Sequence, residues 1–267
     1  MPIKTKNLFV LILTGFCIFS DLICTAAAVE VPNNPVAAQL ESIQQYQESG
    51  KYTEARKMYE TLMQNASLLP EQKESVRRDF EKLNMQILFS RIETPESEFY
   101  TVVAGDSLYA IAKKFKTTID LIKKSNALSK DTIYAGVKLK IMKGSFSVRI
   151  DKSDNALTLF LNEKFVKQYD VSTGKDNITP VGDFEIVNKL ENPTWFHAGA
   201  VVPPESPENI LGTRWLGFNY QGYGIHGTTD PDSIGKQVSA GCVRMRNQDA
   251  EELYAILPVG TKVMIKD

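Results

Sequence analysis

The chain has 267 residues, and its 31 lysines and arginines against 32 aspartates and glutamates give a formal net charge of -1. This balance excludes the positive charge field on which nucleic-acid binding depends, so no nucleic-acid partner is expected. Hydrophobic residues make up 43% of the chain, which is enough for a packed core in one or two domains or in several small modules.

The first segment has the layout of a secretory signal. Lys4 and Lys6 precede an uncharged apolar run over 8–20, and small residues follow up to Ala28. The run is shorter than the roughly 20 residues that cross a bilayer, so no membrane span is expected after processing. A lipid anchor on Cys24 is disfavoured, because the residues directly before this cysteine do not include the small residue that a lipoprotein signal has there. We therefore expect residues 1–28 to be a signal peptide and the protein to be exported to the periplasm or cell wall.

Export makes one cysteine conspicuous. Cys17 and Cys24 lie in the segment expected to be removed, which leaves Cys242 alone in the mature chain. A disulfide within the chain is then impossible. A lone thiol in an oxidising compartment is a liability unless it is buried or used.

Residues 29–93 have the pattern of amphipathic helices. Two helices are predicted to meet at Gly50, and a third begins after Pro70, a residue typical of a first helical turn. The segment 48–55 is similar to the turn of a tetratricopeptide repeat, although one copy is a weak signal. A helical spacer or protein-docking surface is favoured over a dedicated peptide-binding groove.

A polar linker is predicted at 94–98, and residues 99–143 then follow the order strand, helix, helix, strand. The run from Tyr100 to Leu108, together with the stretch 133–136, resembles a lysin motif (LysM) along its whole length. The resemblance implies binding to glycans that contain N-acetylglucosamine. It places the contacts in two loops, with the candidate residues Gly105, Asp106, Ser107, Leu108, Asn126 and Leu128. By spacing alone, Leu108 is a core residue.

Residues 145–267 are rich in predicted strands. A hairpin is expected around the turn 162–164, one helix at roughly 248–257 and a last strand at 261–265. We expect a mainly β domain, a sandwich or barrel, which the linker upstream allows to fold by itself. The predicted architecture is thus multidomain: a helical region, a βααβ module and a mainly β domain.

Two glycine-containing stretches in this last domain carry potential chemistry. His226 lies in Tyr-Gly-Ile-His-Gly-Thr and Cys242 in Ser-Ala-Gly-Cys-Val-Arg. An imidazole that accepts the thiol proton produces a nucleophilic thiolate, and Gly241 allows the backbone N–H groups to approach a developing oxyanion. Spacing alone also permits a buried structural thiol beside an ordinary histidine. A zinc site would need three or four ligands, and only His197 and some carboxylates could complete the set.

These stretches, with Ser-Thr-Gly at 172–174, Thr-Pro-x-Gly at 179–182 and Trp195, resemble the L,D-transpeptidase catalytic domain of the YkuD type over about the last 120 residues. The resemblance implies that Cys242 is the nucleophile, that His226 is the base and that the Gly227 carbonyl orients the imidazole. The chemistry that the resemblance implies needs no metal or cofactor. It also implies an oxyanion hole at Ala240, Gly241 and Cys242, and substrate contacts from Arg244, Ser239, Tyr223 and Trp195. Many members have a histidine where this chain has Ala240, which leaves side-chain contacts there in doubt.

The activity implied is peptidoglycan L,D-transpeptidation. Cys242 would attack the carbonyl of the third residue of a tetrapeptide stem, release D-alanine and pass the acyl group to an amine, as a 3-3 cross-link or as attachment of a protein. With water as acceptor the enzyme would be an L,D-carboxypeptidase. A protein of another class, which binds the wall without catalysis, is the remaining alternative, and intact Cys242 and His226 argue against it.

Overall fold

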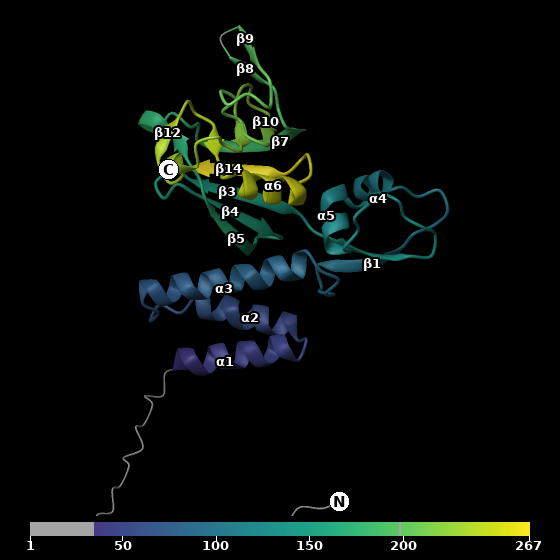
Figure 1. Ribbon diagram of the computed structural model, residues 1–267. Coiled ribbons are helices and arrows are strands. Elements are labelled where there is room, and N and C mark those ends of the chain that lie inside the picture. Colours follow the sequence, from purple (N-terminus) through teal and green to yellow (C-terminus); the bar gives the residue numbers. More distant parts are fainter. Residues whose placement is uncertain (1–34, 198) are drawn as a thin grey trace, which may run out of the picture.

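The computed structural model describes residues 35–197 and 199–267, so the predicted signal peptide lies outside the described residues. None of the helices in these ranges is long and apolar enough to cross a membrane. Three parts follow one another along the chain: a layer of three helices, a small βααβ unit and a large sheet with one covering helix (Figure 1).

The helical layer consists of α1 (Pro35–Glu48), α2 (Tyr52–Met63) and α3 (Pro70–Leu88), as the sequence pattern predicts. Gly50 has a φ of 74°, a left-handed conformation that glycine adopts without strain, and it lets the chain turn from α1 into α2. The apolar faces of the three helices form a core of their own, in which the Tyr59 and Phe80 rings stack.

Helix α3 also lies against strand β5 (Lys164–Asp170), which is the edge strand of the large sheet. The Asn84 amide donates to the backbone carbonyls of Phe165 (3.2 Å) and Val166 (3.0 Å), and the Gln168 N–H donates to the Glu81 carboxylate (3.0 Å). An open edge exposes unpaired backbone groups that invite pairing with another chain. The helical layer therefore satisfies and covers this edge.

The βααβ unit contains β1 (Ser97–Thr101), α4 (Leu108–Phe115), α5 (Ile119–Ser125) and β2 (Lys138–Met142). The two strands pair antiparallel, and Ser107 and Thr118 cap the two helices. Strand β1 begins inside the predicted linker 94–98, and the Ser97 hydroxyl is hydrogen-bonded to both backbone groups of Thr94. The polar residues of this segment thus form an ordered, partly buried turn.

The large sheet has eight strands in the order β13-β11-β10-β7-β14-β3-β4-β5. Only the pairs β14–β3 and β11–β13 are parallel. The mainly β domain expected from the sequence is confirmed. The remaining elements are β3 (Phe146–Asp151), β4 (Ala156–Leu161), β6 (Thr173–Gly174), β7 (Gly182–Glu191), β8 (Trp195–His197), β9 (Ala200–Val202), β10 (Arg214–Phe218), β11 (Gly224–His226), β12 (Gln237–Ser239), β13 (Val243–Arg244), α6 (Asn247–Ile256) and β14 (Lys262–Lys266).

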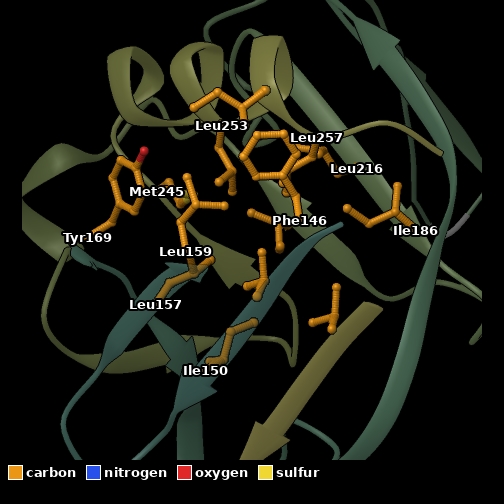
Figure 2. Packing of buried hydrophobic residues seen from close by; sticks show 14 of the residues in the cluster. Phe146, Ile150, Leu157, Leu159, Tyr169, Ile186, Leu216, Met245, Leu253 and Leu257 are labelled. Carbon is orange, nitrogen blue, oxygen red and sulfur yellow. The ribbon is translucent and has the colours of Figure 1, made fainter. Parts of the chain in front are cut away.

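The main core lies between this sheet and α6. Leu253 and Leu257, from α6 and the residue after it, face Phe146, Leu157 and Leu159 from the strands (Figure 2). All five are buried, and burial of such side chains contributes roughly 1.5–3 kcal/mol each. The core therefore fixes α6, whose first residue follows Cys242 by only five positions.

The three parts of the chain contact one another directly. Leu88 of α3 and Leu121 of α5 are buried in the main core of the large sheet. The Lys140 ammonium donates to the carbonyls of Ile87 (2.5 Å) and Ser90 (2.9 Å), and the Thr118 hydroxyl donates to the Ala255 carbonyl at the end of α6. The helical layer and the βααβ unit are thus packed directly against the sheet domain.

Candidate active site

Cys242 lies in the short loop between β12 and β13. Gly241, directly before it, has a φ of 122°, and a Cβ there would come within 2.8 Å of the Tyr223 ring. Both the backbone conformation and the lack of space require glycine at this position. The Tyr223 ring thus supports the loop from behind.

Two buried hydroxyls fix the backbone of this loop. Ser239 Oγ accepts from the Gly241 N–H (3.1 Å) and donates to the Cys242 carbonyl (2.6 Å). Thr179 Oγ1 accepts from the Gly174 N–H (2.6 Å) and donates to the Gly241 carbonyl (2.9 Å). The loop carbonyls are therefore turned toward these hydroxyls, and the N–H of Gly241 is already engaged.

His226 is the last residue of β11, which runs parallel to β13 and pairs with it through Ile225 to Val243 and His226 to Arg244. Parallel neighbours bring the chemistry of both strands to one end of the sheet. His226 Nδ1 lies 2.6 Å from the Gly227 carbonyl oxygen. A carbonyl only accepts, so Nδ1 carries the proton and Nε2 is left as an acceptor.

His226 and Cys242 line one cavity of about 430 Å³. Among the described residues that line this cavity, Arg244 is the only other one with an ionisable side chain. The remaining lining is largely apolar and comes from β7, β10 and the β8–β9 hairpin, which projects beyond the sheet in Figure 1. The cavity is also lined by Trp195, Trp215, Ser239 and Ala240.

Burial controls the charge of His226 and Cys242. It lowers the pKa of His226 to about 4. The hydrogen bond to the Gly227 carbonyl acts in the opposite direction and raises this pKa, while the nearby Arg244 charge lowers it. Burial raises the pKa of the Cys242 thiol, which donates to the Gly222 carbonyl (3.3 Å). The thiol and the imidazole are therefore both neutral at neutral pH. This differs from the thiolate expected from an imidazole neighbour, because the resting thiol is desolvated and bonded to a carbonyl.

The Arg244 guanidinium has unused bonding capacity. Its Nε is buried and has no hydrogen-bond acceptor among the described residues. The strand position of Arg244, opposite His226, directs it to the same cavity. An acceptor supplied by a bound molecule would satisfy this donor.

The low pKa of His226 predicts an acid-sensitive fold. The unfolded imidazole has a pKa of about 6.5, so between roughly pH 6.5 and 4 the unfolded chain binds more protons. The stabilising contribution of the neutral ring is complete above pH 6.5 and is lost toward pH 4, by about 3 kcal/mol. Urea titrations across this window should show wild type losing that much stability relative to His226→Gln. Parallel stability curves for the two proteins would contradict the burial effect.

Comparisons with known proteins match two parts of the chain to family models. The family model of the L,D-transpeptidase catalytic domain matches residues 145–265, and the LysM domain model matches residues 100–141. The Bacillus subtilis protein YqjB, described as an L,D-transpeptidase, is 43% identical over 126 residues, which cover 45% of this chain and 70% of the relative. YkuD of the same organism, described likewise, is 34% identical over 174 residues, which cover 62% of this chain and 97% of the relative.

The chain belongs to the L,D-transpeptidase family.

A solved L,D-transpeptidase structure from Mycobacterium tuberculosis H37Rv also matches, with 16% identity and a TM-score of 0.41 over 50% of this chain and 63% of that chain. The helical layer is outside both matched family models. It is the part of this L,D-transpeptidase that the family match leaves unexplained.

The structure of this L,D-transpeptidase brings most of the predicted site residues together, but not all of them line the cavity. Ser239, Ala240 and Trp195 line the cavity with His226, Cys242 and Arg244. Tyr223 is half-buried behind Gly241 and is not part of the lining. The Gly241 N–H, predicted as an oxyanion donor, is bonded to Ser239.

The predicted glycan residues of the LysM domain differ in exposure. Asn126 is buried, and its amide is bonded to the backbone of Ile122 and Lys140, so it shapes the loop from inside. Leu108 is a core residue, as its spacing predicts. Gly105 and Ser107 are exposed in the other loop, where Asp106 accepts from the Tyr100 hydroxyl (2.8 Å) and the Val103 N–H (2.9 Å).

Two further residues of the site carried no signal in the sequence. Trp215 lies opposite His226 on the neighbouring strand, and the two rings stack at 6.0 Å. Asn247 opens α6 and is bonded to the loop after His226. Both depend on strand register and helix placement, which local patterns do not specify.

Proposed function

We propose that this L,D-transpeptidase acts on peptidoglycan, with Cys242 as nucleophile and His226 as base. The sulfur attacks the carbonyl of the third residue of a tetrapeptide stem, a carbon–sulfur bond forms, and the amide bond to D-alanine breaks. His226 Nε2 takes the thiol proton and delivers it to the leaving amine. The observation that carries the proposal is that both side chains line one cavity, with Nε2 free to accept.

The resting pair is neutral, so proton transfer accompanies the attack on the bound stem. A base with a low pKa releases its proton readily to the departing amine. The oxyanion is assigned to the N–H groups of Ala240 and Cys242, because the Gly241 N–H is bonded to Ser239. The alanine at 240 retains the donor that this role needs.

Arg244 is proposed to bind a carboxylate of the stem peptide. In the part of the chain that the structure describes, it is the one cation of the cavity wall, and its buried Nε has no hydrogen-bond acceptor. Trp195 and the apolar wall opposite would contact the alkyl part of the stem.

The acyl acceptor decides the product. Transfer to the amine of another stem gives a 3-3 cross-link, transfer to a protein amine gives attachment, and transfer to water makes the enzyme an L,D-carboxypeptidase. Incubation with purified disaccharide-tetrapeptide, with products separated by mass, distinguishes dimer from tripeptide. We expect one of these two products together with free D-alanine. Unchanged tetrapeptide under all conditions would contradict the proposal.

We also propose that the LysM domain retains the enzyme on the glycan in the cell wall. The division that goes with this proposal is a helical region at 29–93, a LysM domain at 99–143 and a catalytic domain at 145–267. Binding the same polymer that carries the stems raises their effective concentration at the active site. A wall polymer also implies export, in line with the signal peptide proposed at 1–28.

Asp106→Ala is expected to weaken retention without weakening chemistry. Asp106 closes the exposed turn through the Tyr100 hydroxyl and the Val103 N–H, so its loss disorders the loop assigned to the glycan. Pelleting with insoluble peptidoglycan should fall, while turnover of a soluble tetrapeptide stays within about twofold. Asp131→Ala is the control, since Asp131 is exposed and its ion pair among the described residues is with Lys123. Equal pelleting of both variants and wild type would contradict the assignment of this loop.

A further inference from the structure

Asn247 makes two backbone hydrogen bonds beside the proposed base. Its Oδ1 accepts from the Thr228 N–H (3.0 Å) and from the Thr213 N–H (3.2 Å). These N–H groups belong to the segment after β11 and to the segment before β10. One side-chain oxygen at the start of α6 therefore joins the ends of the two strands that carry His226 and Trp215.

The bond to Thr228 has a particular consequence for His226. The Thr228 N–H and the Gly227 carbonyl are the two ends of a single planar peptide group. That carbonyl is the partner of His226 Nδ1 at 2.6 Å. Asn247 thus holds the peptide from one side while the imidazole is bonded to its other side, and bonds in such a chain polarise and strengthen one another.

The surrounding glycines fit this arrangement. A Cβ at Gly227 or at Gly212 would collide with Asn247 Oδ1. Gly227 has no left-handed φ that would require glycine for conformational reasons, so space for the Asn247 amide accounts for it. The rest of the segment is fixed by backbone bonds, from the Gly227 N–H to the Arg214 carbonyl (3.1 Å) and from the Met245 N–H to the His226 carbonyl (2.8 Å).

We propose that Asn247 is a positioning residue for His226: by fixing the 227–228 peptide plane it keeps Nδ1 protonated and Nε2 directed to the cavity. The role in catalysis rests on the proposed function, in which His226 is the base. The side chain itself does not line the cavity. It acts through the peptide, as an orienting partner acts behind a functional histidine.

The test combines imidazole ¹⁵N shifts with acylation kinetics on the full chain. The sequence has two histidines, so His226→Ala identifies the His226 signals. In wild type we expect the Nδ1-protonated tautomer. In Asn247→Ala we expect a mixture with the Nε2-protonated form, and a maximal rate of acylation by a carbapenem that falls about 10- to 100-fold with little change in half-saturating concentration.

Asn247→Asp keeps the accepting oxygen and adds a negative charge. It should preserve the tautomer, raise the pKa of His226 and retain most of the acylation rate at neutral pH. Gln248→Ala, an exposed change next in the same helix, should match wild type. A wild-type tautomer and rate in Asn247→Ala would overturn the proposal. If that variant does not fold, an unchanged His226 pKa in Asn247→Asp would overturn it instead.

The two levels of the account fail separately. If Asn247→Ala shifts the tautomer while His226→Ala acylates at the wild-type rate, the positioning of the ring stands and its role as base falls. If His226→Ala is slow and Asn247→Ala changes neither shifts nor rate, the base stands and the positioning role falls.

Discussion

We expect His226→Ala to slow acylation of Cys242 by a carbapenem by about 10²- to 10⁴-fold, the usual worth of general-base assistance. Cys242 is a desolvated thiol whose pKa is raised by burial, so in the proposed mechanism it needs a base at the moment of attack. Nε2 of His226 is the acceptor in the same cavity. The intact mass of the protein, followed over time after mixing, gives the rate directly.

The control for this experiment is His197→Ala, which removes the other histidine of the sequence. It should acylate within a few-fold of wild type. Circular dichroism and tryptophan fluorescence should show that His226→Ala keeps the native fold at neutral pH. A folded His226→Ala protein that acylates at the wild-type rate would remove His226 from the mechanism.

We expect Leu121→Ala to lower the stability of the catalytic domain by about 2–5 kcal/mol, although Leu121 belongs to the LysM domain. The side chain is 1% exposed and is buried in the main core beside α6. Both tryptophans, Trp195 and Trp215, are in the catalytic domain, so fluorescence in a urea titration reports its unfolding. An unchanged fluorescence midpoint would contradict the shared core.

Ile122→Ala is the matched comparison. Ile122 is the next residue of α5 and is equally buried, but its contacts lie within the core of the LysM domain itself. Its substitution should shift the fluorescence midpoint less.

The contacts of Leu88 and Leu121 with the main core argue against the independent folding expected from the polar linker, because a chain beginning at residue 145 would lose both side chains from its core. We expect a chain that begins at residue 145 to be less stable than the full protein.

The sequence was sufficient to predict the three helices, the βααβ unit and the mainly β domain, because each has a local apolar period. It did not predict how they pack together. Leu121 and Ile122 both satisfy the helical pattern, and the sequence does not distinguish which core each one enters. The Asn84 and Glu81 contacts with β5 likewise depend on which strand becomes the edge of the sheet.

The candidate site, too, was predicted only in part from the sequence. His226 and Cys242 were predicted as base and nucleophile from the resemblance of their short motifs to the L,D-transpeptidase domain, since their spacing alone also permits a structural thiol beside an ordinary histidine. Two hydrogen bonds were not predicted: the Gly241 N–H donates to Ser239, and the Asn126 amide donates to a buried backbone carbonyl. Both donors have several possible partners within the fold. Asn247 is one polar residue among many in the sequence. Its position beside the Gly227–Thr228 peptide exists only in the folded chain.

The most direct test of the central claim is the mass of the protein caught during turnover. The enzyme is mixed with disaccharide-tetrapeptide, quenched in acid and measured intact and after proteolysis, with Cys242→Ala treated in parallel. The account predicts a gain equal to the disaccharide-tripeptide acyl group, located on the peptide that contains Cys242 and absent from the variant. An adduct on another residue, or products formed by Cys242→Ala, would contradict it.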